Sequence, residues 1–210
     1  MTCWHSVATA EYSMKPWSES CEQNRAPILD VLRAEISHCS KLLEIGSGTG
    51  QHAVYFAPEF PSLSWQTSDR RENHPGILAW LDDTDANNIL PPLDLDVHRD
   101  DWPGCCFDAV FSANTAHIMG WTEVQGLFAG VGRILDPGGV FCLYGPFNYG
   151  GRYTSESNAR FDQWLKARDP KSGVRDFEAL QELAADAGMR LRGDYEMPAN
   201  NRTLVWSKTS

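Results

Sequence analysis

The sequence lacks long hydrophobic runs and clusters of positive charge. No apolar stretch approaches the roughly 18 residues of a membrane-spanning helix, so we expect no transmembrane segment. The 210 residues carry a formal net charge of −10, and no run of Lys or Arg occurs. Because an acidic surface repels phosphate backbones and anionic headgroups, neither nucleic acid nor a membrane is expected as a partner.

Paired cysteines and metal-ligand spacings are also missing. The six cysteines include no Cys-x-x-Cys pair, and no two histidines stand at the spacing of a metal site. Scattered thiols of this kind are typical of a reducing compartment. The first residues lack a basic start followed by an apolar stretch, so we expect no signal peptide. These observations predict a cytoplasmic protein without a bound metal.

What the sequence does contain is typical of one globular domain. Hydrophobic residues make up 42% and charged residues 22% of the chain, proportions that are ordinary for a folded protein. Residues 1–20 show no clear periodicity and are predicted to form an N-terminal arm or lid. A single domain is expected over residues 21–210, with a polar insertion at about residues 145–175.

Segments with strand character alternate with segments of helical periodicity. This alternation predicts an α/β fold with a mostly parallel sheet and helices on both faces. The short connection between the last two strands favours an antiparallel pair. Strands are expected at residues 41–45, 63–69, 93–97, 107–112, 140–144, 189–196 and 202–207. Helices are expected near residues 21–38, 51–57, 75–83 and 122–135, around residues 161–165, and from residue 176 to residue 188.

Local signals refine three of these bounds. Pro27 predicts that the first helix starts near it or bends there. Thr122 and Gln125 have the spacing of a capping box at a helix start. The residues Asp136-Pro-Gly-Gly139 predict a turn that leads into the fifth strand.

A glycine-rich stretch, LEIGSGTGQH, follows the first predicted strand. Two cofactor classes use such loops. The dinucleotide fingerprint G-x-G-x-x-G is met only in a frame that starts at Gly48 and ends on Ala53. Asp69 ends the second strand, where an acid contacts the ribose in both classes, and so it does not separate them.

The pattern Glu44-x-Gly46-x-Gly48-x-Gly50 resembles the first motif of class I methyltransferases that use S-adenosylmethionine. In that class the glycines let the backbone pass close to the methionyl part of the cofactor. The ends of the later strands agree with the same resemblance. Asp96 and Val97 look like the pair at the adenine, and Asn114 stands where the class has its fourth motif.

The resemblance implies a Rossmann-like class I methyltransferase fold, with a seven-stranded, mostly parallel sheet and an antiparallel C-terminal strand. It also implies S-adenosyl-L-methionine as the cofactor and S-adenosyl-L-homocysteine as the product. The cofactor-binding residues that it implies are Glu44, Gly46, Ser47, Gly48, Gly50, Asp69, Asp96, Val97 and Asn114.

Longer segments resemble one particular family. These segments are LEIGSGTGQHAVYFA, GLFAGVGRILDPGG, LYGPFNYGG, SNARFD, RDP, VRDFE and MPANN. They look like the family catalogued as domain of unknown function 938, which includes methyltransferase-like protein 26, from about Ser20 to Lys208. The resemblance implies methyl transfer but does not identify a substrate. The stretch SESCEQNRAP departs from the family's usual arm at Cys21 and Gln23.

Methyl transfer is an in-line displacement in which the cofactor supplies the reactive group and the protein aligns the nucleophile. The catalytic candidates are His117 and Asn114. His117 is either a base for a hydroxyl or thiol, given an ordinary pKa of about 6.5, or a histidine that bonds loop backbone. The substrate-binding candidates are Arg25, which suits a carboxylate, and Tyr144, Phe147, Asn158 and Asp162, which follow the fifth strand or lie at its end.

A methyltransferase that acts on a small molecule is the leading hypothesis. One alternative keeps the cofactor and changes the reaction to a rearrangement or cyclisation in natural-product metabolism. Another is a cofactor-binding partner without catalysis. An NAD oxidoreductase fits least well. The sequence leaves open the acceptor atom, which is O, N, S or C, and the oligomeric state.

Overall fold

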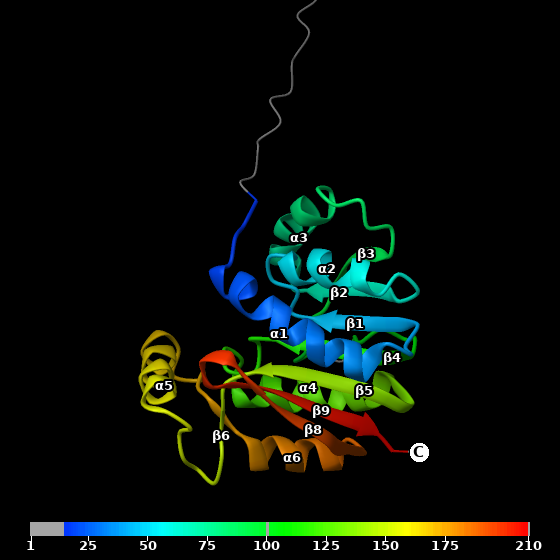
Figure 1. Ribbon diagram of the computed structural model, residues 1–210. Helices are drawn as coiled ribbons and strands as arrows, with labels where there is room; N and C mark the ends of the chain where they lie inside the picture. Colours follow the sequence, from blue (N-terminus) through cyan, green and yellow to red (C-terminus); the bar gives the residue numbers. More distant parts are fainter. Residues whose placement is uncertain (1–14, 100, 210) are drawn as a thin grey trace, which may run out of the picture.

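Seven strands form the central sheet in the computed structural model of the chain, in the order β3-β2-β1-β4-β5-β9-β8 (Figure 1). The structure describes residues 15–99 and 101–209. Within this sheet, only the contacts of β9 with β5 and β8 are antiparallel, which confirms the predicted sheet. The strands are β1 Lys41–Ile45, β2 Ser64–Asp69, β3 Ile89–Asp94, β4 Phe107–Ala113, β5 Leu135–Gly145, β8 Met189–Met197 and β9 Asn201–Lys208.

Helices cover both faces of the sheet, as predicted (Figure 1). Buried side chains of α1 and α2 join one hydrophobic cluster, and those of α4 and α6 join a second cluster on the opposite face. The predicted arm over residues 1–20 lies mostly outside the described residues. The helices are α1 Glu19–Ile36, α2 Gln51–Phe56, α3 His74–Leu81, α4 Trp121–Ile134, α5 Glu156–Arg168 and α6 Phe177–Asp186. Three short 3₁₀ helices are Ala57–Glu59, Arg71–Asn73 and Pro198–Asn200.

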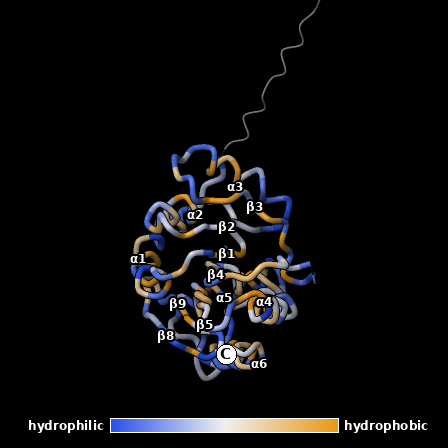
Figure 2. The backbone as a smooth tube through the Cα atoms, turned by 90° about the vertical axis from the view of Figure 1, so that its right-hand side faces the viewer, coloured by the Kyte–Doolittle hydropathy of each residue, from blue (hydrophilic) through white to orange (hydrophobic). Residues whose placement is uncertain are grey.

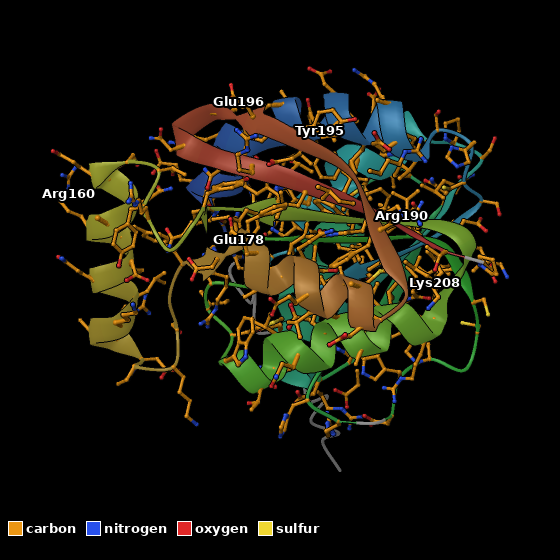
Figure 3. The ribbon with its side chains drawn as sticks, turned by 90° about the horizontal axis from the view of Figure 1, so that it is seen from below. Arg160, Glu178, Arg190, Tyr195, Glu196 and Lys208 are labelled. Atoms are coloured by element: carbon orange, nitrogen blue, oxygen red, sulfur yellow. The ribbon has the colours of Figure 1, made fainter. Side chains whose placement is uncertain are left out.

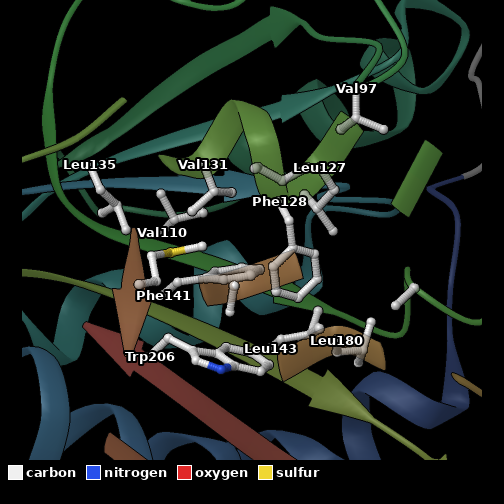
Figure 4. Packing of buried hydrophobic residues seen from close by; sticks show 14 of the residues in the cluster. Val97, Val110, Leu127, Phe128, Val131, Leu135, Phe141, Leu143, Leu180 and Trp206 are labelled. Carbon is white, nitrogen blue, oxygen red and sulfur yellow. The ribbon is translucent and has the colours of Figure 1, made fainter. Parts of the chain in front are cut away.

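Aromatic rings join the last strand to the middle of the sheet. Trp206 of β9 packs edge to face on Phe128 of α4, with ring centroids 5.3 Å apart, and stacks on Phe141 of β5 at 5.6 Å (Figure 4). The Trp206 indole donates a hydrogen bond of 2.8 Å to Gln181 of α6. All three rings are essentially buried. The C-terminal strand is therefore fixed by the same core that holds α4 and α6.

A second aromatic group lies on the opposite face. Phe56 of α2 meets Phe111 of β4 edge to face at 5.6 Å, and Trp65 of β2 packs beside both. Along the backbone, hydrophilic stretches lie mainly at the periphery (Figure 2). Burial of apolar surface on both faces of the sheet holds β1, β2 and β4 in place beneath the loops that form the site.

The third strand begins and ends earlier than predicted. We expected it over residues 93–97, whereas β3 runs over Ile89–Asp94 and contains Pro91 and Pro92. Proline lacks a backbone N–H and is tolerated on an edge strand, and β3 is the edge of this sheet. Asp96 and Val97 consequently lie beyond the strand end, in the loop that follows it.

Three other local predictions differ from the structure. The first helix begins at Glu19, so a start near Pro27 is wrong, and Pro27 lies inside the helix, where the predicted bend stays a prediction. The cap of α4 is Gly120 and not Thr122, because the Gly120 backbone N–H donates to Glu123 at 2.5 Å. The predicted turn at residues 136–139 is a bulge within β5, because Leu135 pairs with Phe107 and pairing resumes only at Val140.

Between β5 and α6 the chain forms a small substructure of its own. The strands β6 Phe147–Asn148 and β7 Arg175–Asp176 pair in parallel, and α5 lies between them in sequence. Figure 3 shows α5, which carries Arg160, standing apart from the sheet. The buried Asp162 carboxylate ties this helix to the segment before β7, since it accepts a hydrogen bond from the Val174 backbone N–H at 2.8 Å, while Lys166 of the same helix donates to it at 2.7 Å.

Candidate functional site

The strand order reverses between β1 and β4, and the loops that follow these two strands diverge there. In open α/β sheets this reversal creates a crevice beyond the carboxyl ends of the strands. The glycine loop leaves β1 at that point. Gly46 and Ser47 both donate their backbone N–H groups to the Ser68 carbonyl, at 3.0 and 2.9 Å. The loop is thus anchored to the end of β2.

The three glycines of the loop all have positive φ, but their surroundings differ. A Cβ on Gly46 (φ +72°) would lie 2.6 Å from the Thr115 side chain, and one on Gly50 (φ +91°) would lie 3.1 Å from the backbone of Ile77 in α3. A Cβ on Gly48 (φ +59°) would meet only a carbonyl of its own loop, at 4.0 Å. Gly50 is therefore packed against α3, whereas no side chain approaches the Cβ position of Gly48; the cofactor contact predicted for Gly50 stays a prediction.

Glu44 is buried beneath the loop. Its Oε2 accepts hydrogen bonds of 3.0 Å from the Trp65 indole and from the Ser47 hydroxyl. Burial raises the pKa of Glu44 to about 7, and the nearby Asp69 charge adds to this effect against the two hydrogen bonds. Glu44 supports the loop through Ser47, and the cofactor contact that the resemblance implies for it stays a prediction.

Asp69 also supports the loop. Its Oδ2 accepts a hydrogen bond of 2.8 Å from the Gly48 backbone N–H, while Oδ1 accepts from Arg70 and Asn73, each at 2.8 Å. The carboxylate is thus engaged on both oxygens. The neighbouring Arg70, and not Asp69, lines the adjacent cavity. Asp69 thus supports Gly48, which lines the cavity, and the ribose contact that the sequence resemblance implies for Asp69 stays a prediction.

A cavity of about 290 Å³ opens at the carboxyl ends of β1, β3 and β4. We call it the strand-end cavity. Six of the residues named from the sequence line it, namely Gly46, Ser47, Gly48, Asp96, Val97 and Asn114. Sequence reasoning missed several others, namely Ser18, Ser20, Cys21, Arg70, Thr115, Ile118, Met119 and Glu123. No spacing pattern marks this second group, because it comes from four separate segments that only the fold brings together.

The segment that leads into α1 forms one wall of the strand-end cavity. Trp80 of α3 holds this segment, since its indole donates to the Pro16 carbonyl at 2.6 Å and its ring lies 3.7 Å from the Lys15 ammonium. Trp17 packs on the same indole at 5.8 Å. The Ser18 backbone N–H then donates to Gln51 at 2.6 Å. These contacts fix Ser18 beside the glycine loop.

A second cavity, of about 320 Å³, adjoins the first at Asn114. We call it the amide cavity, because its lining includes the four side chains Asn114, Asn158, Asn200 and Asn201. Its other lining residues are His117, Pro146, Ser157, Phe161 and Ala199. Asn114 lines both cavities and has a positive φ of 59°, and its backbone N–H donates to the Tyr144 carbonyl at 2.9 Å.

His117 lies on the wall of the amide cavity and is only 7% exposed. Its ring meets Phe161 edge to face at 5.2 Å. Burial, together with the positive charge of Arg175, lowers the pKa of His117 to about 4. The imidazole is therefore neutral near pH 7, so it is a weaker base than the ordinary value used in the sequence analysis implied.

The remaining substrate candidates are placed differently. Asn158 lines the amide cavity. Arg25 pairs with Glu22 at 2.7 Å and stacks on Tyr55, with its guanidinium carbon 4.4 Å from the ring centre. Among the described residues, the walls of the two cavities do not include Tyr144, Phe147, Asp162 or Arg25. Tyr144 and Phe147 are core residues, and Asp162 is occupied in holding α5.

Residues 15–99 and 101–209 contain neither a cluster of metal ligands nor a membrane-spanning helix. Within these residues, no three or more His, Cys, Asp or Glu side chains are grouped so that they could hold a metal ion. None of the helices in the same part of the chain is both long enough and apolar enough to cross a membrane.

Solved structures of methyltransferases share this fold. An O-methyltransferase family protein from Burkholderia thailandensis aligns with a TM-score of 0.78 at 15% identity, over 88% of this chain and 56% of that one. Human N-acetylserotonin methyltransferase, solved with S-adenosylmethionine, gives 0.76 at 16% identity, over 91% and 53%. An O-methyltransferase family 2 protein from Planctomyces limnophilus, solved with apigenin, gives 0.78 at 16% identity, over 90% and 60%.

At these identities the similarity shows the fold alone, and this chain spans between 53% and 60% of the length of those three proteins. The fold is that of class I methyltransferase-like proteins. The chain belongs to the family described as Protein of unknown function (DUF938), whose sequence pattern matches residues 15–208. This match confirms the family resemblance found in the sequence. The family description assigns neither a reaction nor a substrate.

Proposed function

We propose that the protein is an S-adenosylmethionine-dependent methyltransferase that acts on a small molecule. The observation that carries this proposal is the position of Asn114, which lines both the strand-end cavity and the amide cavity. A methyl donor and an acceptor must meet end to end for an in-line displacement. Two adjoining cavities with one shared wall residue supply that arrangement.

The strand-end cavity fits the methyl donor. Gly48 leaves room for the methionyl part, because no side chain approaches the position of its missing Cβ. Asp96 and Val97 line the same cavity, where the carboxylate suits the exocyclic amine of an adenine and the apolar side chain suits the ring face. When bound, the cofactor supplies an activated methyl group. The residues of this chain hold it and exclude water.

The amide cavity fits the acceptor. Because burial keeps His117 neutral near pH 7, we assign it the role of a hydrogen-bonding partner that aligns the nucleophile. Proton abstraction by an imidazole with a pKa of about 4 contributes little, since efficient general bases have pKa values near the working pH. Alignment and exclusion of water are then the main contributions of the protein.

Calorimetry tests the cofactor assignment. We expect S-adenosylmethionine and S-adenosylhomocysteine to bind with micromolar dissociation constants and NAD to show no measurable binding. Asp96→Asn should weaken binding about tenfold, as expected for the loss of one charge-assisted hydrogen bond. The matched control is Asp94→Asn, because Asp94 pairs with Arg71 and Arg99 and does not line the strand-end cavity. Tight binding of NAD without binding of S-adenosylmethionine would contradict the proposal.

Product analysis separates methyl transfer from the two alternatives that share its cofactor. Incubation with S-adenosylmethionine and a fractionated metabolite extract should produce S-adenosylhomocysteine in step with one methylated compound. A rearrangement consumes substrate without forming S-adenosylhomocysteine. A cofactor-binding partner without catalysis consumes neither substrate nor S-adenosylmethionine. Either of these last two results, obtained with a fraction that binds the protein, overturns the proposed reaction while leaving the cofactor assignment intact.

A further inference from the structure

The amide cavity combines hydrogen-bonding groups with an absence of charge. Its polar side chains are four asparagines, one serine and a neutral histidine, and no Asp, Glu, Lys or Arg lines it within the described part of the chain. A site for a charged ligand normally carries an opposite charge, because an ion is costly to bury without a partner. The composition of this lining therefore favours an uncharged acceptor.

Two of the asparagines are fixed in orientation by their neighbours. The Asn158 amide nitrogen donates to the Asn200 carbonyl at 3.0 Å and to the Thr154 hydroxyl at 2.9 Å. The Asn201 amide nitrogen donates to the Pro198 carbonyl at 3.2 Å. Because a carbonyl accepts only from a donor, each amide nitrogen must point toward its carbonyl and each Oδ1 must point away. Neither Oδ1 accepts a hydrogen bond from any described residue, so both remain available as acceptors.

The imidazole of His117 adds an unpartnered polar group. It is 7% exposed, lines the amide cavity and makes no side-chain hydrogen bond to any residue that the structure describes. A buried polar group of this kind favours a ligand that can complete its hydrogen bonds. The Phe161 ring, 5.2 Å from the imidazole, and Pro146 supply flat apolar surface on the same wall.

The cavity disfavours ligands of either charge. Burial and the Arg175 charge keep the His117 imidazole unprotonated down to a pKa of about 4, and the same two effects oppose a cationic ligand beside it. The outward Oδ1 atoms of Asn158 and Asn201 present negative ends of dipoles, and these oppose an anionic ligand.

We propose that the amide cavity binds an uncharged, planar molecule that donates hydrogen bonds through its N–H or O–H groups. This inference rests on the proposed function, because it makes that molecule the acceptor class for methyl transfer. It goes beyond the proposed function in giving the charge, shape and hydrogen-bonding character of the acceptor. It also follows that the molecule contacts the Asn158 and Asn201 oxygens and the His117 ring.

Four small probes of nearly equal shape test the proposal with the full chain at pH 7. Benzamide is neutral and donates hydrogen bonds, acetophenone is neutral without donors, benzoate is an anion and benzamidinium is a cation. We expect benzamide to bind about tenfold more tightly than each of the others in NMR titrations. The side-chain amide signals of Asn158 and Asn201 and the ring signals of His117 should shift with benzamide.

A second test introduces a charge into the lining of the amide cavity. Asn200→Asp adds one carboxylate to the amide cavity, and Asp tolerates the left-handed conformation that Asn200 adopts (φ +59°). This variant should raise the ratio of benzamidinium to benzamide affinity by about tenfold. Gln163→Glu is the matched control, because it adds the same charge to an exposed position of α5 outside the cavity lining. The control should leave the ratio unchanged.

Equal or tighter binding of benzoate, benzamidinium or acetophenone by the unmodified chain overturns the proposal. So does benzamide binding that leaves the signals of Asn158, Asn201 and His117 in place, and so does the absence of benzamide binding. A parallel titration with S-adenosylmethionine keeps the two hypotheses apart. Cofactor binding without the benzamide preference refutes only the acceptor class, whereas the benzamide preference without cofactor binding refutes only the proposed function.

Discussion

At the residue scale, the three glycines of the glycine loop have different surroundings. Gly46 lies against Thr115 and Gly50 against α3, whereas the position of a Cβ on Gly48 is free of other side chains; Gly46 and Gly48 both line the strand-end cavity. A sequence motif records only that three small residues are needed. The contact that makes each one necessary depends on residues far away in the chain. Substitutions in the loop therefore separate into effects on stability and effects on binding.

Gly46→Ala should lower the free energy of unfolding by about 1–3 kcal/mol, because it combines a positive φ with a close contact. The new Cβ would lie 2.6 Å from the Thr115 Cγ2. Adding Thr115→Ser removes that methyl group and keeps a hydroxyl for the 2.7 Å hydrogen bond with Ser112. Urea denaturation should show partial recovery in the double variant. Strictly additive effects of the two substitutions would contradict the proposed contact.

The buried Glu44 carboxyl predicts a pH dependence of stability. Its pKa is raised from 4.5 to about 7 in the folded state, so the folded protein binds one more proton than the unfolded chain between these values. The contribution of Glu44 to stability is therefore present below pH 4.5 and is lost as the pH rises toward 7. This difference between the folded and unfolded pKa of Glu44 corresponds to roughly 3 kcal/mol in the free energy of unfolding.

Glu44→Gln should remove this dependence while keeping an oxygen to accept from Trp65. The free energy of unfolding of the variant, relative to that of the unmodified chain, should rise between pH 5 and pH 7. Above pH 7.5 the difference between the two free energies should be constant. Denaturation curves at intervals of half a pH unit give the measurement. A difference that does not change with pH would show that Glu44 titrates normally in the folded protein.

The site residues that sequence reasoning placed correctly are those tied to a strand end. Gly46, Gly48, Asp96, Val97 and Asn114 all line the strand-end cavity. The carboxyl ends of parallel strands must meet at one edge of a sheet, so their loops converge whatever the rest of the fold does. Whether these residues bind the cofactor stays a prediction.

Residues in the insertion and in α1 could not be placed in the same way. Nothing in the sequence shows that Asp162 is occupied by Lys166 and the Val174 backbone, or that Arg25 is paired with Glu22. The neutral state of His117 likewise depends on burial and on Arg175, which lies 58 positions further along the chain. The Lys166 and Glu22 contacts are local to one helix, but the Val174 contact and the Arg175 charge arise only when separate segments pack together.

At the element scale, the strands that were predicted well are the buried ones. β1, β2 and β4 are flanked on both sides by other strands; β1 and β4 show apolar runs, and β2 shows the alternation of Trp65 and Thr67 with polar residues. β3 was misplaced because Pro91 and Pro92 argue against a strand unless its position at the edge is already known. Whether two prolines can stand in a strand depends on whether it is an edge or a central strand, and the sequence does not give the strand order.

The segment before α1 predicts a measurable effect of Trp80. Trp80→Phe keeps an aromatic ring for Lys15 and Trp17 but removes the indole N–H that bonds the Pro16 carbonyl. The loss of one hydrogen bond should raise the rate of amide hydrogen exchange at Ser18 by about fivefold to tenfold.

Trp164→Phe serves as the control, because Trp164 lies on α5 and contacts none of the residues named for this segment. Hydrogen exchange monitored by NMR or mass spectrometry gives the measurement. Unchanged protection of the Ser18 amide in Trp80→Phe would show that its hydrogen bond to Gln51 alone holds the segment.

At the scale of the whole molecule, the formal charge of −10 limits the partners that the surface can attract. We expect a labelled DNA duplex to bind more weakly than about 100 μM at 0.15 M salt, the weak end of non-specific protein–DNA binding. Fluorescence anisotropy checks this, with a basic protein of similar size as the positive control. Micromolar, salt-sensitive binding would reveal a local basic surface that the net charge conceals.

Asn114 belongs to the wall of both cavities, so the two proposed binding events share one side chain. A ligand that sets the conformation of this side chain in one cavity alters the affinity of the other cavity, and the factor is the same in both directions. The order in which two ligands arrive then affects the rates but leaves the total free energy of the ternary complex unchanged.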